Sequence, residues 1–211
     1  SFADRQRRWD YTDTRAVLAL LLLVGLVCLI SASTPGAARG AANQAGSAAV
    51  VRQGDAYLKG RGVARNPHRA ADIYRRATRA GNKYAAWNLA RLYWNGTETF
   101  QAESKAALKW TRRAAALGST PALIELPRRY RHGNGVSRSR KKANGWLRRA
   151  AEARIKPMMY NYAWRLEQGN EIAIDPAAAL TWYERAAAKG HVVAAYRAGD
   201  LYALRLVFDI Y

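Results

Sequence analysis

Alanines, aromatic residues and glycines recur along this chain with a period of about 36 residues. The clearest copy reads ALTWYERAAAKG over residues 179–190, and similar copies begin at Ala143, Ala107 and Ala70. A second set of glycines keeps the same period, at Gly60, Gly96, Gly133 and Gly169. Two independent markers with one period between about 20 and 50 residues are typical of a solenoid of stacked repeats.

Within each copy, the apolar positions predict two helices. The closing part of a copy has alanine or a larger apolar residue four, eight and eleven residues before its end, and this spacing places them on one helical face. An amphipathic stretch precedes it and ends in Tyr57, Tyr93, Tyr130, Leu166 or Tyr202. We therefore predict an all-α, right-handed α-solenoid of helix–turn–helix repeats over residues 48–211, with about four and a half units.

The expected helix ends carry suitable residues. Asn66-Pro67 and Asp175-Pro176 have the composition of an N-cap followed by proline in the first turn. Left-handed residues that end helices are predicted at Gly81, Gly118 and Gly190.

An uncharged apolar segment precedes the repeats. Residues 1–15 are polar and mixed in charge, whereas residues 16–30 read AVLALLLLVGLVCLI. As a helix, residues 16–34 would span about 28 Å, close to the roughly 30 Å hydrocarbon core of a bilayer. We predict a transmembrane helix over 16–34 and a flexible linker of small residues over 35–47. A cleaved signal peptide with a small-residue site at 31–33, or a buried soluble helix, are the alternatives.

Basic residues flank this predicted span unequally. Arg5, Arg7, Arg8 and Arg15 precede it, whereas Arg39 alone lies between the span and residue 50. The positive-inside rule then places the N-terminus in the cytoplasm. This predicts a single-pass protein of the inner (cytoplasmic) membrane with periplasmic repeats; in a eukaryote the inner mitochondrial membrane fits the same features.

The repeats resemble the Sel-one-like repeats (SLR), relatives of the tetratricopeptide repeats. Residues 60–63 (GRGV) and 133–136 (GNGV) resemble the G-x-G-V turn of that family, and residues 179–191 resemble its A-L-x-W-Y-x-x-A-A-x-x-G-H helix. The resemblance extends over residues 48–211. It implies an α-solenoid that binds other proteins or organises a complex without catalysis of its own.

Two units depart from the pattern of this family. Residues 96–99 (GTET) replace the G-x-G-V turn in the second unit. The third unit has Arg154 in place of the closing glycine and Pro127 within its first helix. We expect both units to be irregular.

No arrangement of residues predicts catalysis, a cofactor or a metal. His68, His132 and His191 lie far apart with no carboxylate at a fixed spacing, and no G-x-S-x-G, P-loop, H-E-x-x-H or C-x-x-C motif occurs. The lone cysteine, Cys28, excludes an internal disulfide. We therefore predict a non-enzymatic protein with no catalytic, cofactor-binding or metal-binding residues.

The tryptophans and tyrosines divide between the two predicted helices of a unit. Trp110, Trp146 and Trp182 recur on the apolar face of second helices, so we expect them in the core. First helices carry the other aromatic residues, and solenoids commonly bind partners along an extended concave surface. We predict a partner-binding groove at Tyr93, Trp94, Tyr130 and Trp164.

The chain is strongly basic, with 35 Lys and Arg residues against 15 Asp and Glu residues and a formal net charge of +20. Arginines recur five and six residues before the ends of the copies. This predicted basic ladder comprises Arg76, Arg113, Arg149, Arg185, Arg75, Arg112 and Arg148. It favours an anionic partner, such as acidic protein subunits, lipid headgroups or an acidic polysaccharide. Nucleic acid would fit the charge, but an exported domain would not meet it.

The end of the chain is apolar, although the exposed end of a solenoid normally needs a polar outer face. We predict a docking face at Leu204, Val207, Phe208 and Tyr211. Together these features favour a membrane-anchored scaffold, an accessory subunit that assembles or stabilises a respiratory, photosynthetic, secretory or export complex. The alternative is a periplasmic module that binds an anionic polymer or an acidic partner, and high salt would abolish that binding.

Overall fold

The computed structural model describes residues 35–169 and 172–208, with side chains described from 46 to 169 and from 172 to 206. The chain divides into two compact units, Ser1–Ala49 and Val50–Tyr211. The predicted transmembrane span at 16–34 lies outside the described residues. Among the helices that are described, none combines the length and the apolarity that crossing a membrane requires.

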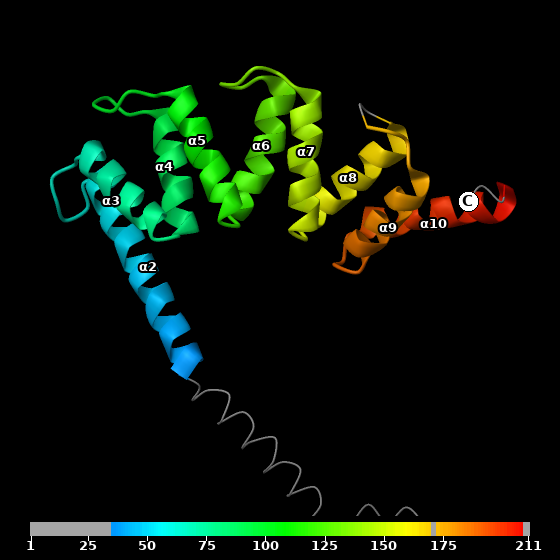
Figure 1. Cartoon of the computed structure of the whole chain (residues 1–211), viewed down its shortest axis with the longest axis horizontal. Helices are drawn as coiled ribbons and strands as arrows, with labels where there is room; N and C mark the ends of the chain where they lie inside the picture. Colours follow the sequence, from blue (N-terminus) through cyan, green and yellow to red (C-terminus); the bar gives the residue numbers. More distant parts are fainter. Residues whose placement is uncertain (1–34, 170–171, 209–211) are drawn as a thin grey trace, which may run out of the picture. The chain divides into compact units, whose positions relative to one another are not determined.

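Helices follow one another along the described chain with short connections (Figure 1). First helices of the repeats are α2 (Pro35–Lys59), α4 (Lys83–Asn95), α6 (Thr120–His132), α8 (Lys156–Gln168) and α10 (Val192–Phe208). Second helices are α3 (Pro67–Arg79), α5 (Ser104–Ala116), α7 (Arg140–Glu152) and α9 (Pro176–Ala187). From α3 to α10, each helix packs against the next. The predicted all-α solenoid of helical repeats is confirmed.

The helix ends form as their residues predict. The side chain of Asn66 accepts a hydrogen bond from the backbone N–H of Arg69 at 2.9 Å, and Asp175 accepts one from Ala178 at 2.8 Å. The closing residues of all four full repeats have a positive φ: 86° at Gly81, 78° at Gly118, 60° at Arg154 and 76° at Gly190. Arg154 therefore makes the same left-handed turn as the glycines, at a steric cost that they avoid.

The expected irregularity occurs in the second repeat and not in the third. After Gly96, the backbone of Thr97 and Phe100 exchanges two hydrogen bonds, and the Phe100 ring is buried against Tyr93 and His68. In the third repeat, α6 continues through Pro127 and has the same 13-residue length as α4 and α8. The loss of one backbone donor at Pro127 does not end the helix there.

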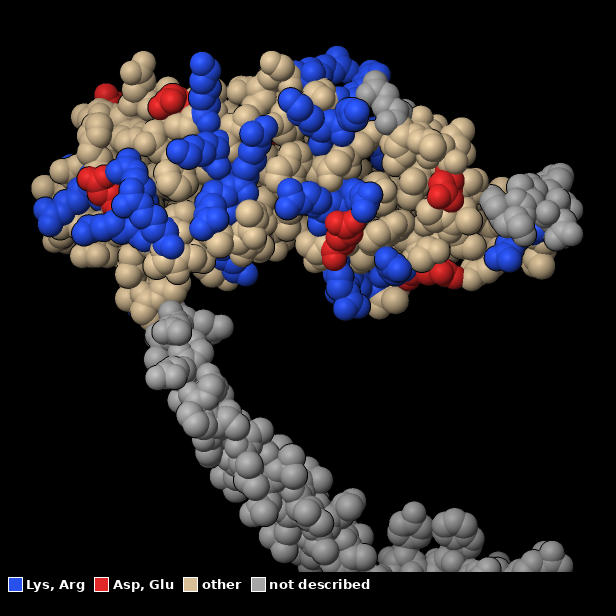
Figure 2. All heavy atoms as spheres, viewed as in Figure 1, with Lys and Arg blue, Asp and Glu red and all other residues tan. Residues whose placement is uncertain are grey.

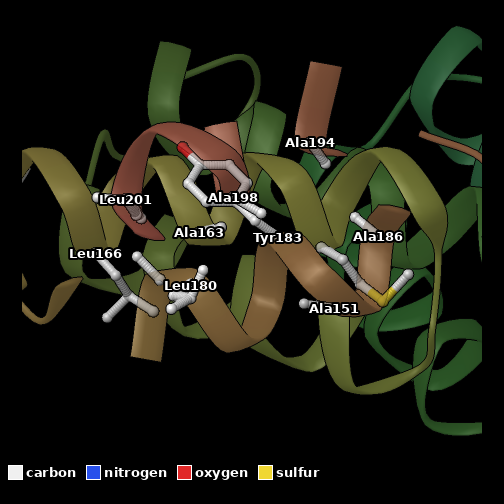
Figure 3. Packing of buried hydrophobic residues seen from close by; sticks show 11 residues of the cluster. Ala151, Ala163, Leu166, Leu180, Tyr183, Ala186, Ala194, Ala198 and Leu201 are labelled. Atoms are coloured by element: carbon white, nitrogen blue, oxygen red, sulfur yellow. The ribbon is translucent and has the colours of Figure 1, made fainter. Parts of the chain in front are cut away.

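Buried alanines bring neighbouring helices together, and one larger residue fills the space between them. This larger residue stands seven positions before the closing residue of each repeat: Tyr74, Thr111, Leu147 and Tyr183, all at most 2% exposed. Figure 3 shows Tyr183 among alanines from α8, α9 and α10. The tryptophans predicted for this role, Trp110, Trp146 and Trp182, are only half-buried one position earlier in the sequence.

Residues 35–47 were predicted as a flexible linker, but they lie in the first half of α2. Alanine recurs throughout this segment and has the highest helix propensity of all residues. A composition of small residues was therefore a poor reason to predict irregular backbone here, since alanine and glycine have opposite effects on a helix.

Candidate functional site

Two arginines of the predicted ladder, each six residues before a closing residue, join successive repeats. An Nη atom of Arg75 on α3 lies 3.4 Å from the hydroxyl of Tyr93 on α4. Arg112 on α5 donates a hydrogen bond to the hydroxyl of Tyr130 on α6 in the same way. Each pair ties the second helix of one repeat to the first helix of the next.

The third and fourth repeats have other residues at the arginine or the tyrosine position, and their contacts differ. In the third repeat, Leu166 replaces the tyrosine, and Arg148 pairs instead with Glu152 at 2.8 Å on its own helix. In the fourth repeat, Glu184 replaces the arginine and accepts a hydrogen bond from the hydroxyl of Tyr202. The residue at this position therefore joins successive repeats where the next first helix has a tyrosine, and pairs within its own helix where it does not.

Two other ladder arginines stack on tryptophan. The guanidinium of Arg149 lies 4.5 Å from the ring centroid of Trp146, and that of Arg185 lies 4.7 Å from the centroid of Trp182. Such cation–π contacts cover the exposed faces of half-buried indoles. Figure 2 shows many Lys and Arg side chains on one face of the molecule. Most of the ladder arginines are exposed, and five of the seven also contact other residues of the repeats.

The aromatic residues of the predicted groove mainly pack between helices. Tyr130 is 2% exposed and so lies in the core. Trp94 donates a hydrogen bond from Nε1 to Oγ1 of Thr111 at 2.9 Å, and the guanidinium of Arg129 lies 3.5 Å from its ring centroid. Half-buried Tyr93 and Trp164 also pack against core clusters. A partner would reach Tyr93, Trp94 and Trp164 only at their exposed edges, and it would not reach Tyr130.

Two buried tyrosines bind carboxylates within their own repeats. Tyr183 donates a hydrogen bond to Oε2 of Glu167 at 2.6 Å, and Tyr74 donates one to Asp55. Burial first, and then these hydrogen bonds, raise the pKa of both tyrosines far above the ordinary value. Phenols with raised pKa values stay neutral, so each tyrosine keeps the proton that it donates to its carboxyl partner.

The last described helix, α10, exposes an apolar face. Val192 is 81% exposed, Tyr196 70% and Leu206 86%, and their spacing places them on one side of the helix. Gly199 and Ala203 lie on the same side and are also exposed. We call these five residues the α10 face.

The α10 face corresponds to a surface that the preceding repeat covers. One repeat earlier, Tyr160 on α8 packs against Tyr183 on α9 with ring centroids 5.6 Å apart, and Glu167 binds the hydroxyl of Tyr183. Tyr196 and Ala203 occupy the equivalent positions on α10. The part of the α10 face at Tyr196, Gly199 and Ala203 is therefore equivalent to the surface of α8 that packs against α9.

Of the docking face predicted from sequence, Leu204 alone has a described side chain. Leu204 is 46% exposed. The backbone of Val207 and Phe208 is helical, but their side chains and Tyr211 lie outside the described residues. Sequence reasoning missed Val192, Tyr196 and Leu206, and the counterpart of Tyr196 on α8, Tyr160, was the signal for one of them.

Within the described residues, no group of three or more His, Cys, Asp or Glu side chains is placed to hold a metal ion. The histidines serve other contacts. Nε2 of His68 lies 2.7 Å from the carbonyl oxygen of Thr99, and the ring of His191 stacks on Tyr160 with centroids 4.6 Å apart.

Helix–turn–helix repeats that pack each on the next define this protein as an α-solenoid repeat protein. The Sel1 repeat model matches residues 47–82, 83–119, 122–154 and 157–191, and the chain belongs to the Sel1 repeat family. Repeats of this family mediate protein–protein interactions, and its members are generally non-enzymatic scaffolds.

Solved structures of the family are similar to the chain. A Sel1 repeat protein from Oxalobacter formigenes is 30% identical, with a TM-score of 0.59 over 82% of this chain and 69% of that one. The protein c5321, a protective antigen of uropathogenic Escherichia coli strains with an SLR fold, is 28% identical with a TM-score of 0.57. The match covers 78% of this chain and 35% of c5321. No curated protein matches the chain.

Proposed function

We propose that this protein is a non-enzymatic, membrane-anchored scaffold that assembles or stabilises a larger membrane protein complex. The repeats bind protein subunits, and residues 16–34 anchor the chain in the bilayer. In this proposal the protein has a single span in the inner membrane, with its N-terminus in the cytoplasm and its repeats in the periplasm.

The α10 face is the observation that carries the proposal. It exposes Val192, Tyr196 and Leu206 to solvent. Large apolar side chains that are exposed together on a protein surface are typical of sites that bind another protein. Its small residues at Gly199 and Ala203 permit close approach of a helix, as Ala163 does between α8 and α9. The occupant we expect is an amphipathic helix of a partner subunit with alanines spaced three or four residues apart, as in α3, α5, α7 and α9.

The contacts of the basic ladder support protein binding over polymer binding. A module that holds an anionic polymer needs a row of accessible cations. Here Arg149 and Arg185 stack on tryptophans and Arg112 binds a tyrosine hydroxyl, so these cations, although exposed, are already engaged within the repeats. A partner recognised mainly through an apolar helix face would stay bound at high ionic strength, because salt screens only the charged contacts.

Extraction of the protein from native membranes with a mild detergent, followed by a high-salt wash, tests this proposal. We expect integral membrane subunits to remain bound in a constant ratio, measured by quantitative mass spectrometry. A Tyr196→Asp/Leu206→Asp variant should lose them, whereas a Gln168→Asp/Gln101→Asp variant, which changes the net charge equally at two exposed positions, should retain them. Recovery of the wild-type protein alone after the wash would refute the scaffold and favour binding of an anionic polymer.

A further inference from the structure

A hollow of about 550 Å³ lies between the second helices of the first two repeats. Its wall consists of the C-terminal end of α3 and the middle of α5. The lining residues are Thr78, Arg79, Lys109, Trp110, Arg112 and Arg113. We call this hollow the Trp110 pocket, and its volume is within the range of about 300 to 1,000 Å³ that is usual for ligand sites.

Trp110 differs from the equivalent tryptophans of the later repeats. Trp146 and Trp182 are each covered by the arginine three residues further on, at 4.5 and 4.7 Å from the ring centroid. The equivalent residue of the second repeat, Arg113, lines the pocket instead. The cation over Trp110 is Lys109, at 5.7 Å from the centroid. No arginine therefore stacks on the indole of Trp110 as Arg149 and Arg185 do on Trp146 and Trp182.

The charge of the pocket has one sign. Four of its six lining residues are Lys or Arg, and none is Asp or Glu. Arg112 also binds the hydroxyl of Tyr130, which fixes its position, while Arg79, Lys109 and Arg113 are exposed. A ligand that fits must combine carboxylates or similar anions with an apolar group, because the cations surround an indole.

We propose that the Trp110 pocket binds an acidic segment of a protein partner. An apolar or aromatic side chain of that segment packs on the indole of Trp110, and flanking Asp or Glu residues pair with Arg79, Lys109 and Arg113. This inference rests on the proposed scaffold function and names the chemistry of one partner segment. The occupant is a protein segment rather than a polymer of uniform charge. The indole packs against apolar or aromatic side chains and does not bind an anion, so a purely anionic chain would leave it unused.

Fluorescence anisotropy of the full chain with a labelled peptide of sequence DEEFEED tests the pocket. We expect this peptide to bind, DEESEED to bind about tenfold more weakly because it lacks the apolar anchor, and KKKFKKK not to bind. Trp110→Ala should weaken DEEFEED binding by about tenfold, since aromatic anchors dominate such contacts.

A matched pair of charge reversals separates the pocket from the general charge of the protein. Arg113→Glu and Arg185→Glu change the net charge equally, and they stand at equivalent positions of the second and fourth repeats. We expect Arg113→Glu to weaken binding at least about tenfold and Arg185→Glu to leave it nearly unchanged, because salt screens a charge that lies more than about 10 Å away. Trp110 also packs against the core, so Trp110→Ala can destabilise the fold. If Trp110→Ala does not fold, Arg79→Glu takes its place in the test, because Arg79 is exposed.

Three results would overturn the proposal. Equal losses in Arg113→Glu and Arg185→Glu would mean that net charge alone binds the peptide. Unchanged binding in Trp110→Ala, or in Arg79→Glu where that variant replaces it, would exclude the pocket. Stronger Trp110-dependent binding of a single-stranded oligonucleotide, or of anionic phosphatidylglycerol vesicles, would assign the pocket to another class of ligand.

If membrane subunits remain bound to the wild type while DEEFEED does not bind, the pocket fails and the scaffold stands; if no subunit is retained, the scaffold fails whatever the peptide does.

Discussion

Removal of one hydroxyl from the core should destabilise the fourth repeat. Tyr183 is fully buried, and its hydroxyl donates a hydrogen bond of 2.6 Å to Glu167. Tyr183→Phe keeps the ring and leaves the carboxylate without this donor. The side chain of Glu167 is 18% exposed and lies 3.9 Å from Arg197, so water and Arg197 can compensate in part.

The size of the effect follows from the geometry of this pair. A hydrogen bond to a charged group contributes about 1.5 to 3 kcal/mol to stability. Because Glu167 keeps some access to water, we expect a loss near the lower limit, about 1.5 kcal/mol. In a folded unit of this size, about 1.5 kcal/mol corresponds to a fall in Tm of roughly 3 to 6 °C.

Urea unfolding followed by circular dichroism measures this loss. The matched control is Tyr196→Phe, which removes a hydroxyl from a tyrosine that is 70% exposed and should change the free energy of unfolding by less than about 0.5 kcal/mol. A double-mutant cycle with Glu167→Ala, which removes the acceptor, isolates the contribution of the pair. If Tyr183→Phe is no less stable than Tyr196→Phe, the phenol–carboxylate bond does not stabilise the repeat and this reasoning is wrong.

Three further predictions concern the same scaffold. Leu89→Ala removes a fully buried side chain from α4 and should cost about 2 to 5 kcal/mol in urea unfolding; a smaller cost would mean that the site collapses around the cavity. Arg154→Gly removes the steric strain of a side chain at a φ of 60° and should raise the free energy of unfolding by about 0.5 to 1 kcal/mol. A lower Tm in calorimetry would contradict the steric argument. Because the pKa values of Tyr74 and Tyr183 are raised in the folded state, their contribution to stability should be complete below about pH 10, the unfolded value, and should fall as the pH rises above it. Tyrosinate absorbance near 295 nm and the urea midpoint should show these two groups ionising only with unfolding, and their titration in the native protein together with exposed tyrosines would refute this.

The repeat pattern predicted the helix pairs because the alanines that let helices approach must recur at fixed positions. It did not predict which large residue fills the space between them. The tryptophan positions and the buried positions of Tyr74 and Tyr183 differ by one residue, which is about 100° around a helix. The angle between neighbouring helices decides which of two adjacent residues is buried, and the pattern within one helix does not contain that angle.

The arginine–tyrosine ties could have been predicted from the sequence, and the α10 face could have been predicted in part. Arg75 and Arg112 each precede a tyrosine by 18 residues, and this spacing recurs with the repeat. The exposure of Tyr196 required the knowledge that its equivalent on α8 packs on α9. The Trp110 pocket could not have been predicted, because it depends on where one arginine side chain lies.

Photo-crosslinking from position 196 tests the central claim most directly. A photoreactive phenylalanine analogue replaces Tyr196 on the α10 face, and the same analogue at exposed Gln168 serves as the control. The scaffold account predicts that position 196 crosslinks to one integral membrane subunit in salt-washed membranes and that position 168 does not. No crosslink at position 196, or a crosslink only to a second copy of this chain, would contradict it.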